Sequence, residues 1–519
     1  MITLPVLCVL LAAVFVVALR YESRASTPLG VLSRQAYEAI LSGETQIERS
    51  ASAGVLYNGG VAAAYAGGSY LLSVPADAES ALLSTGFSGK HYTAAFAPDD
   101  AFSDFAQAVS DGHVFSLVVS DGKRYFVDSV VFTTLPVVRI SAAGASNLEN
   151  WSKITIVSPD DSTVGAYCSY HKRGSVSLNF EKSSWHVTFY TTASNRTGVS
   201  LLGMRQSEEW NLVSLYTDPT RLRNKVTIDI WNEIAATNLE NDDYGAHMEF
   251  CELVMDGDYC GLYGLMDPVD ETLLGIDSSS NTYLFKVFRR ITDDLLESYR
   301  EDGDFISLFM ELTYPSDDTA AAGEAWEIAD DYMDAVYGGT MTLDAYDRLF
   351  NLSNAVDCAL FFNCCDLSDN ICKNYFLLWQ TEPDGASRFS KIPWDLDYGF
   401  GNYFSRDVTT HTVFHPELYS AAVVPLDIAA LLEGEPSAVA PLLAARWLEL
   451  RADVLSEESI VGAFTSCRDA LLSSGAYRRE LERWPESPAS DDLSELVAFI
   501  HARLICLDDY YDTLAEGFE

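Results

Sequence analysis

The chain has 519 residues, of which 48% are hydrophobic and 12% aromatic, and its formal net charge at pH 7 is −43. This composition excludes an intrinsically disordered chain, and the length predicts two or three domains. Because so negative a protein is repelled by phosphate backbones and by anionic lipid, we expect no nucleic acid among its partners. The simplest interpretation of the charge is solubility, and the alternative is an affinity for basic protein substrates or divalent cations.

An uncharged segment opens the sequence. Residues 3–19 contain no charged side chain, and Arg20 ends the run. About 17 residues are few for a membrane-spanning helix and many for the apolar core of a signal peptide. We therefore predict that residues 1–20 are a signal peptide or a membrane anchor. The remainder would be extracytoplasmic, either secreted or held at the membrane through this segment alone.

A β-rich α+β module is predicted over residues 27–130. Short apolar runs alternate there with turn dipeptides such as Asn58-Gly59 and Asp121-Gly122. No group of residues in this module indicates a chemistry, so the sequence leaves its role open.

Stronger strand signals occur over residues 135–290. Apolar and polar residues alternate over residues 176–180 and 185–189, which predicts two half-buried strands. Residues 283–288 are predicted as a further short strand, which carries Lys286.

The same region contains the signals of a helix and of a hairpin. Asp218-Pro219-Thr220 is typical of a helix start. Asp256-Gly257 predicts a tight turn between two strands. Cys251 and Cys260 flank this turn and could form a disulfide across it.

The rest of the chain has a mainly helical pattern. Residues 291–345 are acidic, with breaks at Pro315 and Gly338-Gly339, and we interpret them as an insertion or lid. Residues 346–519 form the larger helical region, in which an apolar stripe leads into Asp366.

The residues after this stripe carry the strongest chemical signal. Asp369 and Asn374 lie five residues apart in a predicted loop. A β-hairpin follows over residues 375–392, and Asp395 comes directly after its second strand. The sequence therefore predicts two loops, joined by a hairpin, that bring these three side chains to one divalent-metal and phosphate site.

Phosphoryl transfer requires these residue types. It needs a carboxylate that orients an attacking hydroxyl and accepts its proton, oxygen ligands for magnesium, and a cation near the phosphates. An Asp, an Asn five residues later, a hairpin and a second Asp is the arrangement of protein kinases. The flanking residues differ, because Trp394-Asp395-Leu396-Asp397 stands where kinases have Asp-Phe-Gly.

At these motifs the sequence resembles the CotH family, atypical kinase-like proteins first known from bacterial spore coats. The resemblance covers roughly residues 135–460 and rests on five stretches in the same order. They are Arg173-Gly174-Ser175 with Lys182 and Trp185, Asp218 to Lys225, Glu252-Leu253 with Asp256-Gly257 to Tyr263, Asp369 to Asn374, and Pro393 to Gly401.

The resemblance implies a fold and an activity. The fold is α+β and two-lobed like a protein kinase, with a β-rich small lobe over residues 135–290, a helical large lobe over residues 346–519 and the extra N-terminal module. The activity is that of an exported or surface-anchored Ser/Thr kinase, which transfers phosphate from ATP to extracytoplasmic proteins with Mg²⁺ or Mn²⁺.

The same resemblance implies roles for the two loops. Asp369 is the implied catalytic carboxylate, and Asn374 and Asp395 are the implied metal ligands. Asp397 is a candidate for a supporting role or for a second metal ion.

Three cationic residues are implied on the nucleotide side. Lys182 is the implied phosphate contact, and Lys286 is its rival for that role. Arg223 either orients phosphates or pairs with an acidic group of its helix.

The nucleotide side also departs from the expected pattern. The sequence has no G-x-G-x-x-G loop, which only Arg173-Gly174-Ser175 approximates, and the doubled lysine of the family is Glu181-Lys182 here. A purely structural interpretation stays open, because Asp and Asn often cap helices and turns and edge strands often carry lysine.

Two alternative functions therefore stay open. One is a structural or adhesive surface protein of the same fold that binds metal without turnover. The other is an enzyme that transfers a nucleotide instead of a phosphate. The sequence does not indicate the protein substrate or the oligomeric state.

Overall fold

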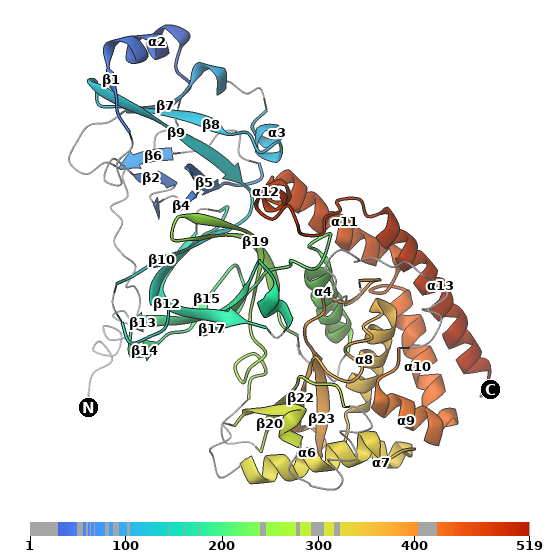
Figure 1. Ribbon diagram of the computed structural model, residues 1–519. Helices are drawn as coiled ribbons and strands as arrows, with labels where there is room; N and C mark the ends of the chain where they lie inside the picture. Colours follow the sequence, from blue (N-terminus) through green and yellow to red (C-terminus); the bar gives the residue numbers. More distant parts are fainter. Residues whose placement is uncertain are drawn as a thin grey trace, which may run out of the picture. The chain divides into compact units, whose positions relative to one another are not determined.

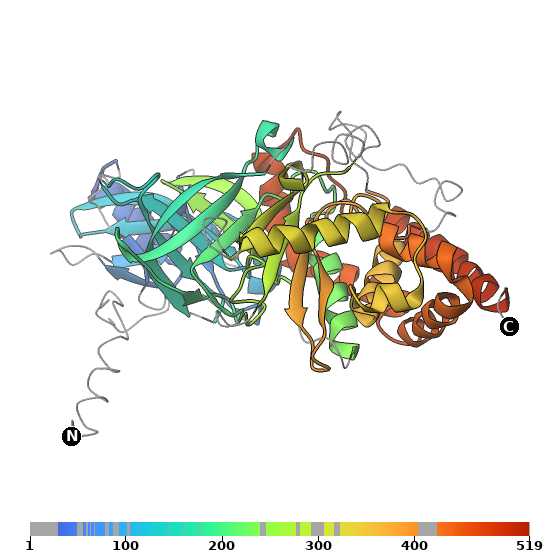
Figure 2. The ribbon, with the colours of Figure 1, turned by 90° about the horizontal axis from the view of Figure 1, so that it is seen from below.

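The protein is a mixed α+β protein in the computed structural model (Figures 1 and 2). The residues described are 30–48, 55–58, 61–62, 64–66, 68–77, 83–86, 93–100, 104–144, 146–160, 162–174, 176–238, 245–276, 281–291, 306–315, 322–402 and 423–517. Residues 1–20, Gly59, Ser175 and parts of the 291–345 segment, on which predictions were made, lie outside them.

The described residues form two compact units, each built from separate stretches of the chain. Unit 1 comprises residues up to Ser214, Glu249–Leu265 and Asp469–Glu486. Unit 2 comprises Leu215–Met248, Met266–Arg468 and the stretch from Ser487 onward. The domain boundaries proposed from the sequence are contiguous and stay predictions.

The N-terminal part of unit 1 contains a six-stranded and a three-stranded sheet. In the larger sheet β9 pairs in parallel with β1 and β5 and antiparallel with β8. Apolar residues on one face, among them Phe115, Val130 and Phe132, form a buried core. The elements are α2 (Arg34–Gly43), β1 (Thr45–Gln46), β2 (Val55–Asn58), β3 (Val61–Ala62), β4 (Ala64–Ala66), β5 (Ser69–Ser73), β6 (Leu83–Gly86), β7 (Thr93–Phe96), η1 (Pro98–Asp100), α3 (Phe105–Ser110), β8 (Phe115–Ser120) and β9 (Arg124–Thr133).

An eight-stranded sheet of unit 1 closes on itself. Its strand order is β12-β11-β10-β18-β19-β17-β13-β14, and β12 also pairs with β13. Alternate residues such as Val138, Ile140 and Phe189 point into one apolar core, as the period of two requires. The elements are β10 (Val137–Ala142), β11 (Ser152–Val157), β12 (Thr163–Arg173), η2 (Val176–Asn179), β13 (Ser184–Thr192), β14 (Asn195–Arg196), β17 (Glu209–Val213), β18 (Met248–Met255) and β19 (Asp258–Met266), beside the small ribbon of β15 (Val199–Ser200) and β16 (Gln206–Ser207).

The structure confirms one strand prediction here and corrects another. Residues 185–189 lie in β13, as expected, whereas residues 176–179 form the 3₁₀-helix η2. Gly174 explains the difference, because its φ of +116° interrupts the extended chain and the Ser177 hydroxyl occupies the place of a Cβ atom. The predicted turn at Asp256-Gly257 has positive φ at both residues, as a type I′ turn requires.

The cysteines beside this turn do not pair. Cys251 is buried and Cys260 is partly exposed, and both are free thiols. Burial raises the pKa of each thiol, so neither has the thiolate character of a metal ligand or a nucleophile.

Unit 2 contains an antiparallel four-stranded sheet with the order β21-β20-β22-β23. It consists of β20 (Tyr283–Val287), β21 (Met310–Tyr314), β22 (Tyr375–Thr381) and β23 (Ser387–Pro393). The 291–345 segment therefore contributes a strand to the sheet that carries Lys286, and it is not helical throughout.

Helices make up the rest of unit 2, apart from the 3₁₀-helix η3 (Ile306–Leu308). They are α4 (Arg223–Thr237), α6 (Ala322–Tyr337), α7 (Leu343–Asp347), α8 (Leu352–Cys365), α9 (Leu426–Gly434), α10 (Pro436–Arg451), α11 (Glu457–Ser473) and α13 (Ser494–Glu516). The last turn of α11 and all of α12 (Ala476–Arg483) belong to unit 1.

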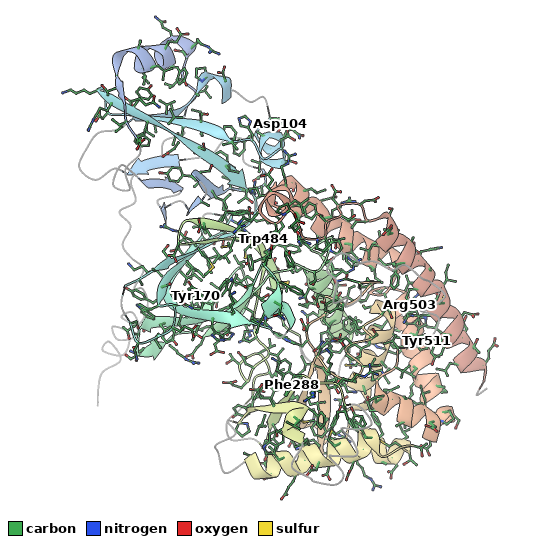
Figure 3. The ribbon with its side chains drawn as sticks, viewed as in Figure 1. Asp104, Tyr170, Phe288, Trp484, Arg503 and Tyr511 are labelled. Carbon is green, nitrogen blue, oxygen red and sulfur yellow. The ribbon has the colours of Figure 1, made fainter. Side chains whose placement is uncertain are left out.

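Helix α8 is the central helix of unit 2. It is apolar on nearly all its faces, which predicts burial, and it packs against α4, α9, α10, α13 and β23 (Figure 1). Arg503 and Tyr511, labelled in Figure 3, hold its last turn from α13 through Asn363. The C-terminal end of α8 is therefore firmly positioned where the first predicted loop begins.

The predicted membrane contact needs correction. No helix in the part of the chain that the structure describes is long and apolar enough to cross a membrane. Residues 1–20, on which the prediction of an anchor depended, are not among the described residues.

Candidate functional site

Two loops of unit 2 contain the predicted site. The first acidic loop, residues 366–374, connects α8 to β22, and the second acidic loop, residues 394–402, follows β23. Asp366 ends α8 in the left-handed conformation with φ 56°. Because β22 and β23 pair with Tyr375 opposite Pro393, the hairpin brings the end of one loop beside the start of the other.

Asp369 and Asn374 are in direct contact. Asn374 Nδ2 donates a hydrogen bond of 2.9 Å to Asp369 Oδ2, and Lys373 Nζ lies 2.7 Å from the same oxygen. The Asp369 side chain is 34% exposed, so it is partly open to solvent. Because Asn374 uses its amide nitrogen here, its amide oxygen is directed elsewhere and can serve as a cation ligand.

Backbone hydrogen bonds hold Asn374 beside the second acidic loop. The Trp394 N–H donates to the Asn374 carbonyl at 3.1 Å, and the Asn374 N–H donates to the Val287 carbonyl at 2.8 Å. Asp395 follows Trp394 directly. Both Asn374 and Asp395 have left-handed backbones, with φ of 59° and 60°. This conformation is uncommon outside glycine and is concentrated at functional sites.

Asn370 joins the two loops from within. Its side chain is fully buried, and Nδ2 donates hydrogen bonds of 2.8 Å to the carbonyls of both Asn374 and Trp394. The two residues that it holds are the predicted metal ligand of the first loop and the residue before the predicted ligand of the second. Asn370 therefore sets the spacing of the two loops.

Asp397 is the most buried carboxyl group of the second acidic loop. Thr217 Oγ1 donates to its Oδ2 at 3.2 Å, whereas Oδ1 has no hydrogen-bond partner among the described residues. Burial, and then the nearby charge of Asp395, raise the pKa of Asp397 well above its usual value. A positive charge bound beside these two carboxyl groups would offset their mutual repulsion.

The Tyr398 hydroxyl lies near the negative charges of both acidic loops. Burial raises the pKa of its hydroxyl, and three further carboxylates raise it more, those of Asp397, Asp395 and Asp369. Both loops therefore contribute negative charge to the surroundings of this hydroxyl.

Arg223 connects α4 to the second acidic loop. Its side chain is 3% exposed, and Nη1 lies 2.6 Å from Asp218 Oδ1, while Nη2 donates to the Phe400 carbonyl at 3.4 Å. Burial alone would raise the pKa of Asp218, but the Arg223 charge and several hydrogen bonds lower it overall. Of the two roles expected for Arg223, the structure places it in the acidic pair.

Lys286 lies on the strand beside Asn374. It precedes Val287, whose carbonyl binds the Asn374 N–H, and its Nζ lies 5.9 Å from the centre of the Phe376 ring. Phe376 in turn contacts Trp394 edge to face, with ring centres 5.6 Å apart. Lys286 therefore belongs to the same part of unit 2 as the two acidic loops.

Lys182 belongs to unit 1, and its ammonium group is fully buried there. Nζ lies 2.7 Å from Glu480 Oε1, donates to the Leu262 carbonyl and faces the Tyr263 ring at 4.5 Å. Glu480 lies on α12 and also accepts the Leu262 N–H. In this structure the ammonium group is bound within unit 1 and is not exposed to a ligand.

The donor set of the two loops fits a hard divalent cation. Carboxylate and amide oxygens are the ligands that Mg²⁺ and Mn²⁺ prefer. Buried oxygens of Asn370, Asp397 and Asn402 have no partner among the described residues, and a bound ion is one way to satisfy such atoms. No group of three His, Cys, Asp or Glu side chains in the described ranges is arranged as a metal site.

Sequence reasoning missed two residues that hold the acidic loops in place. Asn370 and Thr217 were not singled out, although Asn370 lies inside the Asp-to-Asn interval and Thr217 precedes the Asp218 motif. Their polarity gave a signal, but only the tertiary structure shows which carbonyl or carboxyl groups they bind.

The structure defines a mixed α+β protein in which a β-hairpin joins two acidic loops. Comparisons with known sequences assign the family. Residues 171–507 match the sequence profile of the CotH family, described as CotH kinase protein. Because the match covers more than half of the chain, the chain belongs to the CotH family. The predicted resemblance is thereby confirmed.

One characterised relative is the inner spore coat protein H of Bacillus subtilis (strain 168). The two sequences are 27% identical over 137 residues, which cover 24% of this chain and 33% of the relative. The similarity thus spans about a third of the length of that relative.

Proposed function

We propose that this chain is a metal-dependent phosphotransferase, which moves the terminal phosphate of ATP to Ser or Thr hydroxyl groups of proteins outside the cytoplasm. The observation that carries the proposal is the hydrogen-bonded contact of Asp369 with Asn374 and of Asn374 with the loop of Asp395. The kinase description of the family supports the reaction, and the spore-coat location of the relative supports the compartment.

We also propose a two-lobed, kinase-like arrangement. The β-rich unit 1 would correspond to the small lobe and the helical unit 2 to the large lobe, with the residues before β10 as an additional module. The closed sheet of unit 1 is a departure from an open kinase-like small lobe.

Each residue of the two loops has a distinct task in this proposal. A bound Mg²⁺ or Mn²⁺ would supply neutralising charge for the phosphates. Asp369 orients the acceptor hydroxyl and accepts its proton. Asn374 and Asp395 provide the oxygen ligands, and Asp397 adds negative charge behind them. Lys373, whose Nζ lies 2.7 Å from Asp369 Oδ2, holds that carboxylate in position.

Lys286 is the better candidate for the phosphate contact. It lies one strand from Asn374 in the same unit, whereas Lys182 would have to leave Glu480 and its buried position. A cation on this strand would complete the set of groups that phosphoryl transfer requires.

A second candidate function is a structural or adhesive protein that binds a metal without turnover. The observation that favours it is the burial of Lys182, which leaves the predicted principal phosphate contact engaged elsewhere. Transfer of a nucleotide from the same site would be a third outcome, distinguished by the mass of the product.

The test is incorporation of labelled phosphate from ATP into basic protein substrates with Mg²⁺ or Mn²⁺. We expect transfer by the wild type and a loss of about a hundredfold or more in the Asp369→Asn and Asp395→Ala variants. Asp512→Asn, an exposed change on α13, serves as the matched control. Equal incorporation by all proteins would contradict the assignment of the site to these loops. No incorporation, together with no ATP-dependent thermal shift, would rule out the kinase proposal in favour of the structural one.

A further inference from the structure

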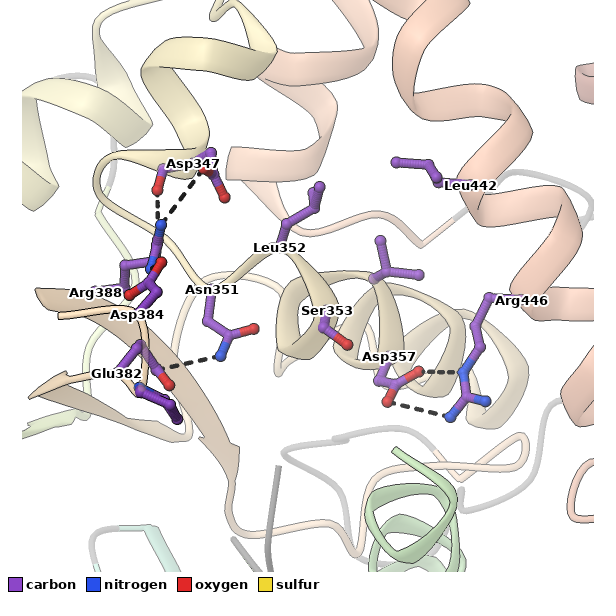
Figure 4. Close-up of a pocket in the computed structure, with 12 residues that line it drawn as sticks. Asp347, Asn351, Leu352, Ser353, Asp357, Glu382, Asp384, Arg388, Leu442 and Arg446 are labelled. Atoms are coloured by element: carbon purple, nitrogen blue, oxygen red, sulfur yellow. Dashed lines mark hydrogen bonds and ion pairs between the residues drawn. The ribbon is translucent and has the colours of Figure 1, made fainter. Parts of the chain in front are cut away.

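Unit 2 contains a groove, shown in Figure 4, that is lined by no residue of the two acidic loops. Its volume is about 770 Å³. The residues that line it come from α7, the start of α8, the turn of the β22–β23 hairpin, β23 and α10. They are Asp347, Asn351, Leu352, Ser353, Val356, Asp357, Glu382, Pro383, Asp384, Arg388, Leu442 and Arg446. We call it the hairpin groove.

The hairpin groove combines an apolar strip with an acidic border. Leu352, Val356 and Leu442 form the strip, and the Leu442 side chain is 41% exposed although it is a large hydrophobic residue. Four carboxylates and two guanidinium groups surround the strip, which gives the lining a net charge of −2.

The two arginines of the groove are already paired. Arg388 lies between Asp347 and Asp384, and Arg446 lies 2.8 Å from Asp357. Asp347 and Asp384 stay 58% and 57% exposed. The charge left for a ligand is therefore negative, and an acidic or phosphorylated partner would be repelled.

We propose that the hairpin groove docks a basic segment of the protein substrate, in which an apolar residue is flanked by lysine or arginine. The apolar side chain contacts Leu442 and its neighbours, and the flanking cations face Glu382 and Asp384. A peptide fits better than a small molecule, because the polar groups of the groove are paired with one another instead of converging on one point.

The position of the groove connects this docking to the proposed phosphotransferase, on which the inference rests. Helix α8 starts at the groove and ends at the first acidic loop, and its 14 residues span about 21 Å. The hairpin turns at the groove and has its other end at Asn374 and Asp395, about 23 Å away over seven residues. An extended chain therefore needs at least about six residues between the docked segment and the acceptor hydroxyl.

The test is direct binding of a labelled peptide, measured by fluorescence anisotropy at low salt without nucleotide. The peptide has one leucine between pairs of lysines, a flexible spacer of eight residues and a serine. We expect saturable binding by the wild-type chain. We expect roughly tenfold weaker binding by Glu382→Gln/Asp384→Asn, which keeps the size of both side chains and removes two charges, and by Leu442→Asn.

Matched controls separate docking from general charge and from catalysis. Asp512→Asn/Glu516→Gln removes two exposed charges from α13, and Asp395→Ala removes a proposed metal ligand, and both should bind the peptide like the wild type. Equal binding by all variants, equal binding of a peptide with glutamates in place of lysines, or no binding would overturn the docking proposal. Because the assay contains no ATP, a chain that binds the peptide but transfers no phosphate would instead contradict only the proposed function.

Discussion

Asn370 is a buried residue whose amide nitrogen binds one carbonyl group in each acidic loop. Asn370→Asp keeps the size of the side chain but places a carboxylate oxygen against those two carbonyl oxygens. We expect Mn²⁺ affinity to fall about 10- to 100-fold, the range found when residues that support metal ligands are changed. Electron paramagnetic resonance titration of free Mn²⁺ measures this change.

The control for Asn370 lies at the other end of α8. Asn354 is also buried, and it binds the backbone of Lys391 through both ends of its amide group. Asn354→Asp should lower the thermal stability to a similar degree while leaving Mn²⁺ affinity unchanged. If both variants lose metal binding equally, the role of Asn370 is only structural.

Two substitutions distinguish the roles of Lys286 and Lys182. Lys286→Met should raise the KM for ATP about tenfold or more with little change in the melting temperature, because the side chain is partly exposed. Lys182→Met leaves Glu480 buried without its cation and should lower the free energy of unfolding by about 3–5 kcal/mol.

A double variant decides the role of Lys182. Adding Glu480→Gln to Lys182→Met removes the unpaired charge and should restore both stability and activity if Lys182 is structural. Restored stability without restored activity would instead assign Lys182 to the nucleotide.

At the scale of elements, the contact of α4 with the second acidic loop depends on the Asp218–Arg223 pair. The pKa of Asp218 is lower in the folded chain than its unfolded value of about 3.9. The stabilisation is therefore fully present above about pH 4 and is lost as the pH falls through the lowered folded pKa.

Asp218→Asn tests this link between helix and loop. The variant should lose about 3–5 kcal/mol of unfolding free energy at pH 7, because Arg223 stays buried without a counter-charge. Its stability should also fall less steeply than that of the wild type below pH 4. Circular dichroism of acid unfolding measures both effects, and identical slopes for the two proteins would contradict the assignment.

Local sequence patterns predicted most elements around the site. The hairpin of β22 and β23 followed from its turn residues, and α8 followed from its apolar stripe. The alternation at residues 176–180 was misleading, because five residues of period two also fit a short 3₁₀ segment after Gly174. The positive φ of one residue, Gly174, was enough to override this short alternation.

At the scale of the whole molecule, the sequence revealed the family. It did not reveal which side chains hold the two acidic loops together. The proximity of Asp369 to Asn374 was predictable, because the two residues lie five positions apart in one loop. Their role in phosphoryl transfer stays a prediction. The burial of Lys182 was not predictable, because its partner Glu480 lies 298 residues away on α12. Contacts between residues so far apart in the sequence do not affect the local spacing of residue types.

The same limit applies to the division of the chain. The contiguous domains proposed from the sequence stay predictions, and the compact units of the structure combine separate stretches of the sequence. Unit 1 includes α12 through two buried ion pairs, Lys182 with Glu480 and Glu252 with Arg479. A change of composition along the chain does not reveal that a late segment such as α12 packs into an earlier unit.

The most direct test of the central claim is the position of a bound metal ion in crystals grown with Mn²⁺ and a non-hydrolysable ATP analogue. The account predicts an anomalous manganese peak between the two acidic loops, at about 2.0–2.2 Å from the Asn374 amide oxygen and an Asp395 carboxylate oxygen. Asp369 should face the terminal phosphate. A peak elsewhere, or bound nucleotide with no metal between these loops, would contradict it.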